Sequence, residues 1–245
     1  MSIFNRKRKL DDESLKNGVG LIAYTEPASV IAEQFRTIRT NIKFSAIDQK
    51  LKTIVFTSSA PSEGKSTVSN NVAVTWAVQG RKILLVDADL RRPTVHRTFS
   101  QNNAKGLSTL LSGNVDMDTA IHETPIKDLS IMTSGPIPPN PSELLGSERM
   151  GEIMKSLSEK FDVVIIDAPP VNTVTDAQVL AARADGTILV VPQGYADKAG
   201  VRHAKQLLDV VHAKILGAIM NRVTAEKSTG YYGGNYGGYY GTGGK

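Results

Sequence analysis

Ser59-Ala-Pro-Ser-Glu-Gly-Lys-Ser66 stands between an apolar run, residues 52–58 (KTIVFTS), and a segment of helical character, residues 65–79. The stretch matches the phosphate-binding loop pattern G-x-x-x-x-G-K-[ST], except that Ser59 takes the place of the first glycine. In such a loop, backbone N–H groups and the N-terminus of the following helix cradle phosphates, and Gly64 allows the backbone to approach them closely. The sequence therefore predicts a strand–loop–helix unit that binds a nucleotide.

Individual side chains of this loop have predicted roles. Lys65 supplies a cation to the β- and γ-phosphates, and the Ser66 hydroxyl can ligate Mg²⁺. A G-K-S-T string occurs by chance in unrelated proteins, but here an apolar strand precedes it and a helix follows. This context favours a genuine nucleotide site. Its predicted nucleotide-binding residues are Ser59, Ser62, Glu63, Gly64, Lys65, Ser66 and Thr67.

Apolar runs alternate with helical patterns along the rest of the chain. Near-continuous apolar strands indicate a parallel sheet covered by helices on both faces, and right-handed crossovers make such a sheet doubly wound. The predicted fold class is therefore α/β, with a doubly wound, mostly parallel sheet. Further strands are expected over residues 82–87, 129–133, 162–167, 186–191 and 215–220, and further helices over 28–46, 150–161, 175–183 and 198–212. Residues 94–124 are expected to form short helical pieces.

The length of 245 residues and the hydrophobic content of 40% suit one large core. We expect an irregular arm over residues 1–26, a nucleotide-binding domain over 27–227 and a separate tail over 228–245. The chain has no cysteine, which excludes disulfides and thiolate chemistry. No run approaches the roughly 20 apolar residues that span a bilayer, and the basic start lacks the apolar stretch of a signal peptide. A cytoplasmic location is therefore expected.

Three aspartates are expected to join the phosphate site. Asp87 ends one predicted strand, Asp89 follows two residues later, and Asp167 ends the strand DVVIID. Because parallel strands end at the same sheet edge as the phosphate loop, these carboxylates should converge there. One aspartate alone would more simply be a helix cap or a solvent contact. Together they could hold Mg²⁺ through water and accept a hydroxyl proton, so Asp87 and Asp89 are predicted catalytic residues beside Lys65.

The last 18 residues, STGYYGGNYGGYYGTGGK, contain eight glycines and no aliphatic core residue. This composition predicts a low-complexity tail. A nucleic-acid-binding or adhesive segment is an alternative, but the interleaved arginines of the former are missing, so no nucleic-acid partner is expected. Each phenol of the tail could also accept a phosphoryl group from a nucleotide bound at the phosphate loop. The predicted phosphorylation sites are five of the chain's seven tyrosines: Tyr231, Tyr232, Tyr236, Tyr239 and Tyr240.

The set TSSAPSEGKST, ILLVDADLRRP and VVIIDAPP resembles the Walker A, Walker A′ and Walker B motifs of the bacterial tyrosine kinases. The chain is most similar to the separate cytoplasmic kinase subunits of Gram-positive capsule and exopolysaccharide synthesis, from about Glu33 to the tail. The resemblance implies an ATP- and Mg²⁺-dependent protein-tyrosine kinase. It assigns Thr67 to the α-phosphate, Asp87 to the base, and Ser66, Asp87, Asp89 and Asp167 to Mg²⁺. It also assigns Asn221 and Arg222 to the adenine.

The resemblance further implies partners. Kinases of this split type associate in rings, phosphorylate one another's tails in trans, act on other tyrosine proteins, and depend on a transmembrane adaptor that recruits them to the inner face of the membrane. Glu33, Arg36 and Arg39 fit the family's E-x-x-R-x-x-R self-association motif, and spacings of three place them along one helix face. The simpler alternative is an ordinary charged surface face.

Partition-type switch ATPases are the main alternative, because they share the fold. They resemble K-G-G-x-G-K-[ST], whose first lysine reaches into a partner's active site. In this chain Ala60 occupies that lysine's position, and Pro61 follows where the rival pattern has glycine. Both departures favour the kinase interpretation. The segment Gly135–Leu145 also resembles a kinase-family loop, although a rigid proline turn explains it equally well.

Overall fold

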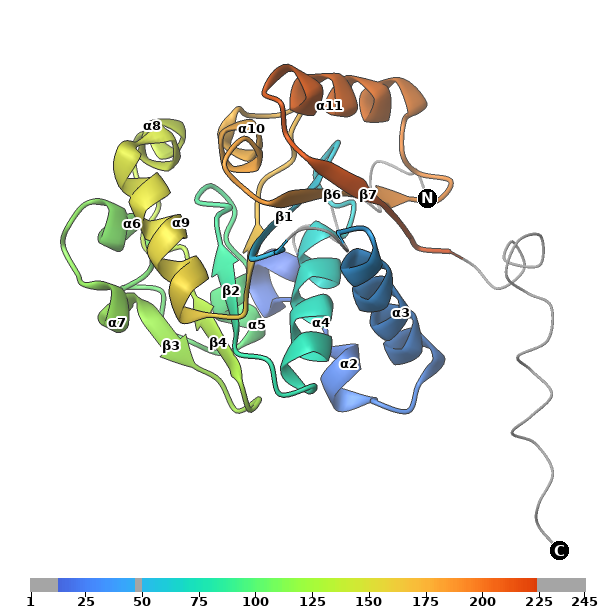
Figure 1. The fold of residues 1–245 in the computed structure, drawn as a ribbon, viewed down its shortest axis with the longest axis horizontal. Coiled ribbons are helices and arrows are strands. Elements are labelled where there is room, and N and C mark those ends of the chain that lie inside the picture. Colours follow the sequence, from blue (N-terminus) through green and yellow to red (C-terminus); the bar gives the residue numbers. More distant parts are fainter. Residues whose placement is uncertain (1–12, 47–49, 224–245) are drawn as a thin grey trace, which may run out of the picture.

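The structure is a computed structural model that describes residues 13–46 and 50–223. Its core is a seven-stranded sheet in the order β3-β4-β2-β5-β1-β6-β7, and every neighbouring pair is parallel except β3 with β4 (Figure 1). This confirms the predicted doubly wound, mostly parallel fold. The strands are β1 Thr53–Ser58, β2 Ile83–Asp87, β3 Ile121–Glu123, β4 Leu129–Met132, β5 Val163–Asp167, β6 Gly186–Pro192 and β7 Ile215–Asn221.

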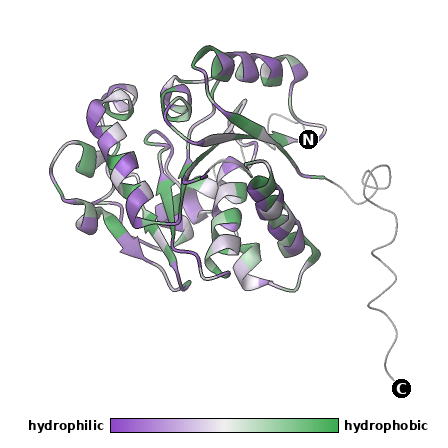
Figure 2. Ribbon diagram, in the orientation of Figure 1, coloured by the Kyte–Doolittle hydropathy of each residue, from purple (hydrophilic) through white to green (hydrophobic). Residues whose placement is uncertain are grey.

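Helices cover both faces of the sheet. The side chains of a strand alternate between the two faces, so apolar strands place apolar side chains on both, and each face has to be shielded from water. In β1, Ile54 and Phe56 belong to the apolar cluster beneath α2 to α5, whereas Val55 belongs to the cluster beneath α6 and α8 to α11. Figure 2 shows apolar strands enclosed by helices with hydrophilic outer sides. The helices are α2 Ile22–Thr25, α3 Val30–Phe44, α4 Lys65–Ala77, α5 Val95–Thr98, α6 Leu107–Leu111, α7 Met117–Ala120, α8 Pro141–Gly146, α9 Glu148–Lys160, α10 Asp176–Ala181 and α11 Lys198–Val210.

Strand order explains how distant motifs meet. Strand β5 lies between β1 and β2, with Asp167 opposite Phe56 on one side and opposite Asp87 on the other. The loop that follows β1, the end of β2 and the end of β5 therefore share one sheet edge.

Three local expectations need correction. The arm expected to be irregular over residues 1–26 is partly helical, because residues 13–17 and α2 are helices and Ala23 is buried against the domain. Strand β3 was not expected within the short helical pieces of residues 94–124, where it pairs antiparallel with β4. Helix α8 begins inside the proline-rich segment, with Pro141 in its first turn, where the missing N–H costs nothing.

Among the residues that the structure describes, no helix is long and apolar enough to cross a membrane.

Candidate functional site

The phosphate loop turns sharply at Gly64, whose φ of +93° is favourable only for glycine. Helix α4 begins at the next residue, Lys65, so its N-terminal N–H groups point into the loop. A Cβ at Gly64 would lie 2.0 Å from Asn221 Nδ2, so a larger residue would displace this amide from its hydrogen bond to the Glu63 carbonyl. The loop thus has the strand–turn–helix geometry that the sequence predicts.

Ser59 and Glu63 bind each other inside the loop. The buried Glu63 carboxylate accepts hydrogen bonds from the N–H of Ser59 at 2.8 Å and of Ala60 at 3.0 Å, and from the Ser59 hydroxyl at 2.9 Å. Unpaired buried N–H groups are costly, so this carboxylate braces the turn. The side chains of Ser59 and Glu63 therefore support the loop, and a phosphate contact from these two residues would have to come from their backbone.

Lys65 lies among carboxylates at the edge of the sheet. Its Nζ is 2.9 Å from Asp89 Oδ2 and 3.6 Å from Asp167 Oδ1. Burial alone would favour the neutral amine, but the Asp167 and Asp89 charges raise the pKa of Lys65 above its usual value. The structure thus brings together three of the predicted site residues, with the lysine as a fixed positive charge.

Asp87 is fully buried next to this group. One carboxylate oxygen accepts hydrogen bonds from the N–H groups of Thr94 and Val95, both at 2.9 Å. Burial, reinforced by the Asp167 charge, raises the pKa of Asp87 to about 8. When ionised, a carboxylate with a raised pKa is a stronger proton acceptor than an ordinary aspartate, which suits a general base.

The same residues fit a phosphate-bound Mg²⁺. Both oxygens of the buried Asp167 carboxylate lack a hydrogen-bond partner among the described residues, and burial raises the pKa of this group. Within the described ranges no three acidic or histidine side chains form a ready metal cage. Mg²⁺ needs none, because it commonly binds through one or two carboxylates, water and substrate phosphates. Ser66, Asp89 and Asp167 lie together at the phosphate loop, and the Mg²⁺ roles predicted for these three residues and for Asp87 stay predictions.

Asn221 and Arg222 contact the phosphate loop from the end of β7. Asn221 Nδ2 donates to the Glu63 carbonyl at 3.0 Å, and Arg222 Nη2 donates to the Ser62 carbonyl at 2.7 Å. The Arg222 guanidinium also lies 5.5 Å from the centre of the Tyr195 ring. In this structure these residues fasten β7 to the loop; their predicted role at the adenine stays a prediction.

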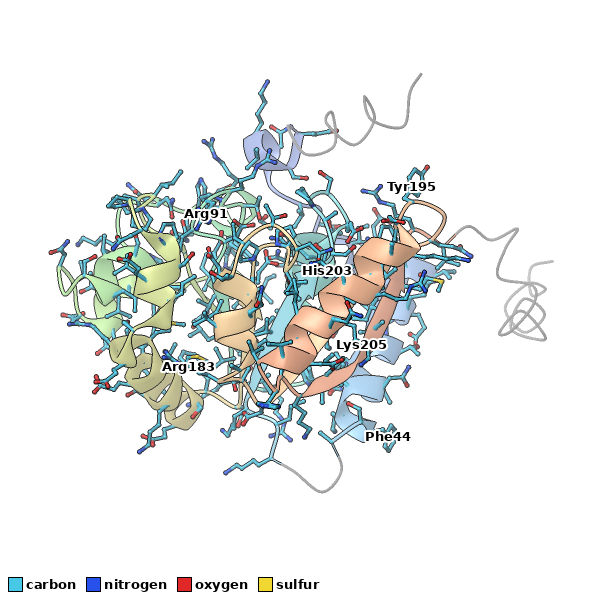
Figure 3. The ribbon with its side chains drawn as sticks, turned by 90° about the horizontal axis from the view of Figure 1, so that it is seen from above. Phe44, Arg91, Arg183, Tyr195, His203 and Lys205 are labelled. Carbon is cyan, nitrogen blue, oxygen red and sulfur yellow. The ribbon has the colours of Figure 1, made fainter. Side chains whose placement is uncertain are left out.

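The sequence does not indicate a second polar group, which lies beside the Asp87–Asp89 segment. The buried Asp176 at the start of α10 accepts hydrogen bonds from Arg91 Nε at 3.1 Å and from the Ser142 hydroxyl of α8. Arg91 follows the Asp87–Asp89 segment, so this contact ties that segment to both helices. Figure 3 places Arg91 at the same end of the molecule as Tyr195, away from Phe44. Nothing in the sequence spacing of these three residues indicates that they meet.

The predicted self-association motif divides into two parts. Arg36 Nε pairs with Glu33 at 2.6 Å on an exposed side of α3. Arg39 is instead buried, and its Nη1 donates to the Thr75 carbonyl at 2.7 Å. Thr75 belongs to the last turn of α4, where carbonyls lack intrahelical partners, so Arg39 caps that helix. The spacing predicts one charged face, but only Glu33 and Arg36 face solvent, whereas Arg39 lies in the contact between α3 and α4.

The five tail tyrosines predicted as phosphorylation sites lie outside the described residues.

Comparisons with known proteins agree with this geometry. A family model for the AAA domain matches residues 51–219. Tyrosine-protein kinase YwqD of Bacillus subtilis (strain 168) is 46% identical over 91% of this chain and 91% of that protein. The solved kinase domain of Escherichia coli tyrosine kinase ETK is 33% identical with a TM-score of 0.82, covering 88% and 85% of the two chains. The chimerical protein CapA2B2 is 41% identical with a TM-score of 0.80, covering 87% and 98%.

The partition-type alternative shares only the fold. The cell division ATPase MinD of Pyrococcus furiosus has a TM-score of 0.60 but is 24% identical, over 69% of this chain and 71% of that one. The higher identity and coverage of the kinases agree with Ala60 and Pro61, which depart from the partition pattern. A nucleotide-binding loop, a lysine, three converging aspartates and close kinase relatives lead to one conclusion: the chain belongs to the bacterial tyrosine kinases, with the P-loop nucleotide-binding fold of that family.

Proposed function

We propose that this kinase transfers the γ-phosphoryl group of ATP to tyrosines of its own C-terminal segment. The observation that carries the proposal is the buried Asp87, which lies opposite Asp167 in the same carboxylate cluster as Lys65 of the phosphate loop. Burial and the Asp167 charge raise the pKa of Asp87. The sequence supplies a matching acceptor, because five of seven tyrosines gather within the last 18 residues. A core that can activate a phenol and a tail rich in phenols fit each other chemically.

Each residue has a distinct part in the reaction. Lys65 neutralises negative charge on the β- and γ-phosphates, and the loop N–H groups hold them in place. Asp87 accepts the phenolic proton as the tyrosine oxygen bonds to the γ-phosphorus and the bond from that phosphorus to the bridging oxygen breaks, which leaves ADP. Mg²⁺, held through Ser66, Asp89 and Asp167, would supply further positive charge to the phosphates. Asp167 has buried carboxylate oxygens that accept no hydrogen bond among the described residues, although one of them lies 3.6 Å from Lys65 Nζ.

Transfer is proposed to pass between subunits of a homo-oligomeric ring. The exposed Glu33–Arg36 pair on α3 supports such contacts, since it is available on the surface of each chain. A chain that carries Lys65→Met cannot donate a phosphoryl group, and a chain with all five tail tyrosines changed to phenylalanine cannot accept one there. Mixing the two should label the Lys65→Met tail. Absence of label in the mixture, with normal labelling of the unmodified chain, would show transfer in cis.

We further propose a transmembrane adaptor, recruitment from the cytoplasm to the inner face of the membrane, and control of capsule or exopolysaccharide synthesis, with other tyrosine proteins as additional substrates. The similarity to a chimerical protein whose name combines a CapA part with a CapB part supports an adaptor. CapB of Staphylococcus aureus is itself named a putative tyrosine-protein kinase and is 41% identical to this chain. Co-purification from membranes with and without the candidate adaptor tests this proposal.

Phosphorylation is proposed to end subunit association. Each phosphotyrosine adds about −1.5 to −2 charges, so five add roughly −8 to −10. This reverses the formal net charge of +5 and crowds like charges at the interfaces. The oligomer mass should therefore fall after incubation with ATP and Mg²⁺. An unchanged mass of the fully phosphorylated protein contradicts this mechanism.

Labelled ATP separates the kinase from its alternatives. A kinase transfers label to the tail, and the label disappears in Lys65→Met and in the five-phenylalanine variant. A switch ATPase releases labelled phosphate without labelling protein, and a nucleotide-dependent scaffold does neither. Either of the last two results contradicts the proposed function.

A further inference from the structure

The cavity at the phosphate loop has a wall that no sequence motif indicates. Leu15 and Val19, from the segment before α2, line this cavity together with Lys65 and Asp89. The loop after β5 also lines the cavity and contributes Pro169, Pro170, Thr173 and Val174. In Figure 3 the short helix of residues 13–17 stands at the same end of the molecule as Arg91. Ser14, Leu15 and Val19 of this segment therefore line the active-site cavity.

Specific contacts hold this segment in place. Gly18 has a φ of +74°, and a Cβ there would lie 2.4 Å from the backbone nitrogen of Thr98, so only glycine permits the approach. The Val19 N–H donates to the Thr98 hydroxyl at 3.0 Å. Asn71 of α4 donates to the Gly20 carbonyl at 2.8 Å and accepts from the Ala23 N–H at 2.9 Å. The segment is thus fastened to the two helices that follow the phosphate loop and Asp87.

The lining of the cavity combines two kinds of surface. Its walls include apolar side chains from two separate segments, whereas Lys65, Asp89, Arg91 and Arg92 give it a charged part. A tyrosine side chain matches these two parts of the cavity, because it has an apolar ring and a polar hydroxyl at its tip.

We propose that Leu15 and Val19 form, with Pro169, Pro170 and Val174, the slot that receives the ring of the acceptor tyrosine. This inference rests on the proposed function and adds a binding site for its substrate. The occupant is the tyrosine-rich segment, residues 231–240 of this chain or of a neighbouring copy. Ring contact in the slot aims the phenolic oxygen at the carboxylates and selects tyrosine over serine and threonine, which lack a ring.

Two observations favour this occupant over the nucleotide base. The wall is attached through the Thr98 hydroxyl to α5, and the N–H of Val95 in the same helix donates to the Asp87 carboxylate. The chain beyond Val223 also begins beside the cavity, because the neighbouring Arg222 donates to the carbonyl of the cavity residue Ser62. The 22 residues from 224 to 245 continue from that point.

The experiment separates donor from acceptor. The donor is the full chain with its five tail tyrosines changed to phenylalanine, and the acceptor is the full chain with Lys65→Met and a native tail. The donor is compared with and without Leu15→Ala and Val19→Ala. Lys16→Ala is the matched control, since Lys16 is exposed in the same segment and does not line the cavity. Transfer rates are measured against acceptor concentration, and ATP affinity and thermal stability are measured on each donor.

The double variant should raise KM for the acceptor chain at least about tenfold, because removing methylene groups from an apolar pocket has effects of this size. Its ATP affinity and the behaviour of Lys16→Ala should be unchanged. An unchanged acceptor KM, or a loss confined to ATP affinity, overturns the inference. Should the double variant unfold, the single Leu15→Ala donor gives the same comparison. Failure of the parent donor to label any acceptor, when the unmodified chain also fails to label itself, would instead refute the proposed function.

Discussion

The Lys65 ammonium lies 2.9 Å from the Asp89 carboxylate and 3.6 Å from that of Asp167, and all three side chains are buried. The lysine that is expected to bind phosphate therefore also neutralises the carboxylates expected to bind Mg²⁺. Its loss should remove a catalytic charge and a structural one together.

Lys65→Met should lower the rate of tyrosine transfer by about 10²–10³-fold or more, the usual cost of losing a charge-stabilising group in an active site. It should also destabilise the fold by about 3–5 kcal/mol, because buried carboxylates lose their counter-ion. Labelling assays and denaturant unfolding measure the two effects. Lys205→Met is the control, since Lys205 pairs with Asp209 on the surface and such pairs contribute less than about 1 kcal/mol. Equal stability loss in both variants contradicts this account.

The raised pKa of Asp87 predicts opposite pH trends for activity and stability. The value of about 8 compares with an ordinary 3.8, so between these pH values the folded state keeps a proton that the unfolded state loses. Stability therefore declines as pH rises from about 4 to 8 and levels off above the folded pKa. The transfer rate, kcat/KM, should instead rise with pH toward about 8, because the base must be ionised.

Asp87→Asn should abolish transfer. It should also reduce the decline in the free energy of unfolding between about pH 4 and 8, which denaturant unfolding without nucleotide or Mg²⁺ measures. Asp167, whose pKa is also raised by burial, contributes the slope that remains. A steep wild-type decline that persists unchanged in Asp87→Asn would assign the titration to another group.

The brace within the phosphate loop predicts unequal effects of its two partners. Glu63→Ala leaves the N–H groups of Ser59 and Ala60 without their acceptor, so ATP affinity should fall about tenfold, which is about 1.4 kcal/mol. Ser59→Gly restores the usual first glycine and removes only the hydroxyl contact, so its effect should be smaller. Calorimetric titration with ATP compares the variants. ATP binding by Glu63→Ala at wild-type affinity would show that the loop holds its shape without the carboxylate.

The two parts of the E-x-x-R-x-x-R motif should behave differently. Arg39→Ala removes the hydrogen-bond donor of the Thr75 carbonyl at the end of α4. Because this carbonyl is then left unpaired, the variant should destabilise the monomer by about 1–3 kcal/mol. Glu33→Ala and Arg36→Ala alter an exposed pair, so stability should change by less than about 1 kcal/mol while oligomer mass falls. Light scattering and thermal unfolding separate these effects. An Arg39→Ala chain of normal stability, or normal oligomers in both surface variants, contradicts the division.

The sequence predicts the parts of the fold that repeat a strong local pattern. Apolar runs such as residues 162–167 became strands within one residue of their expected limits, because burial on both sides of a parallel sheet leaves little room for polar residues. The convergence of Asp87 and Asp167 with Lys65 followed from the same topology. Strand β3 has only three residues, none of them buried, and gives no such signal.

Contacts between segments far apart in the sequence could not be predicted. The spacing of three places Arg39 on the same helix face as Glu33 and Arg36. It cannot show that α4 packs against Arg39 and leaves the other two exposed. The Glu63 brace depends on a loop backbone in which Ser62 has a φ of 62°, and the pattern of residue types does not encode that angle. The wall formed by Leu15 and Val19 is likewise set by packing against α4 and α5.

The central claim is that the core phosphorylates its own tail, and site mapping tests it most directly. The full chain is incubated with ATP and Mg²⁺, digested and analysed by mass spectrometry. The account predicts phosphate on Tyr231, Tyr232, Tyr236, Tyr239 and Tyr240 and none on Tyr24 or Tyr195, the only tyrosines outside the tail. Phosphate confined to Tyr24 and Tyr195, or ADP formed with no modified tyrosine, would contradict it.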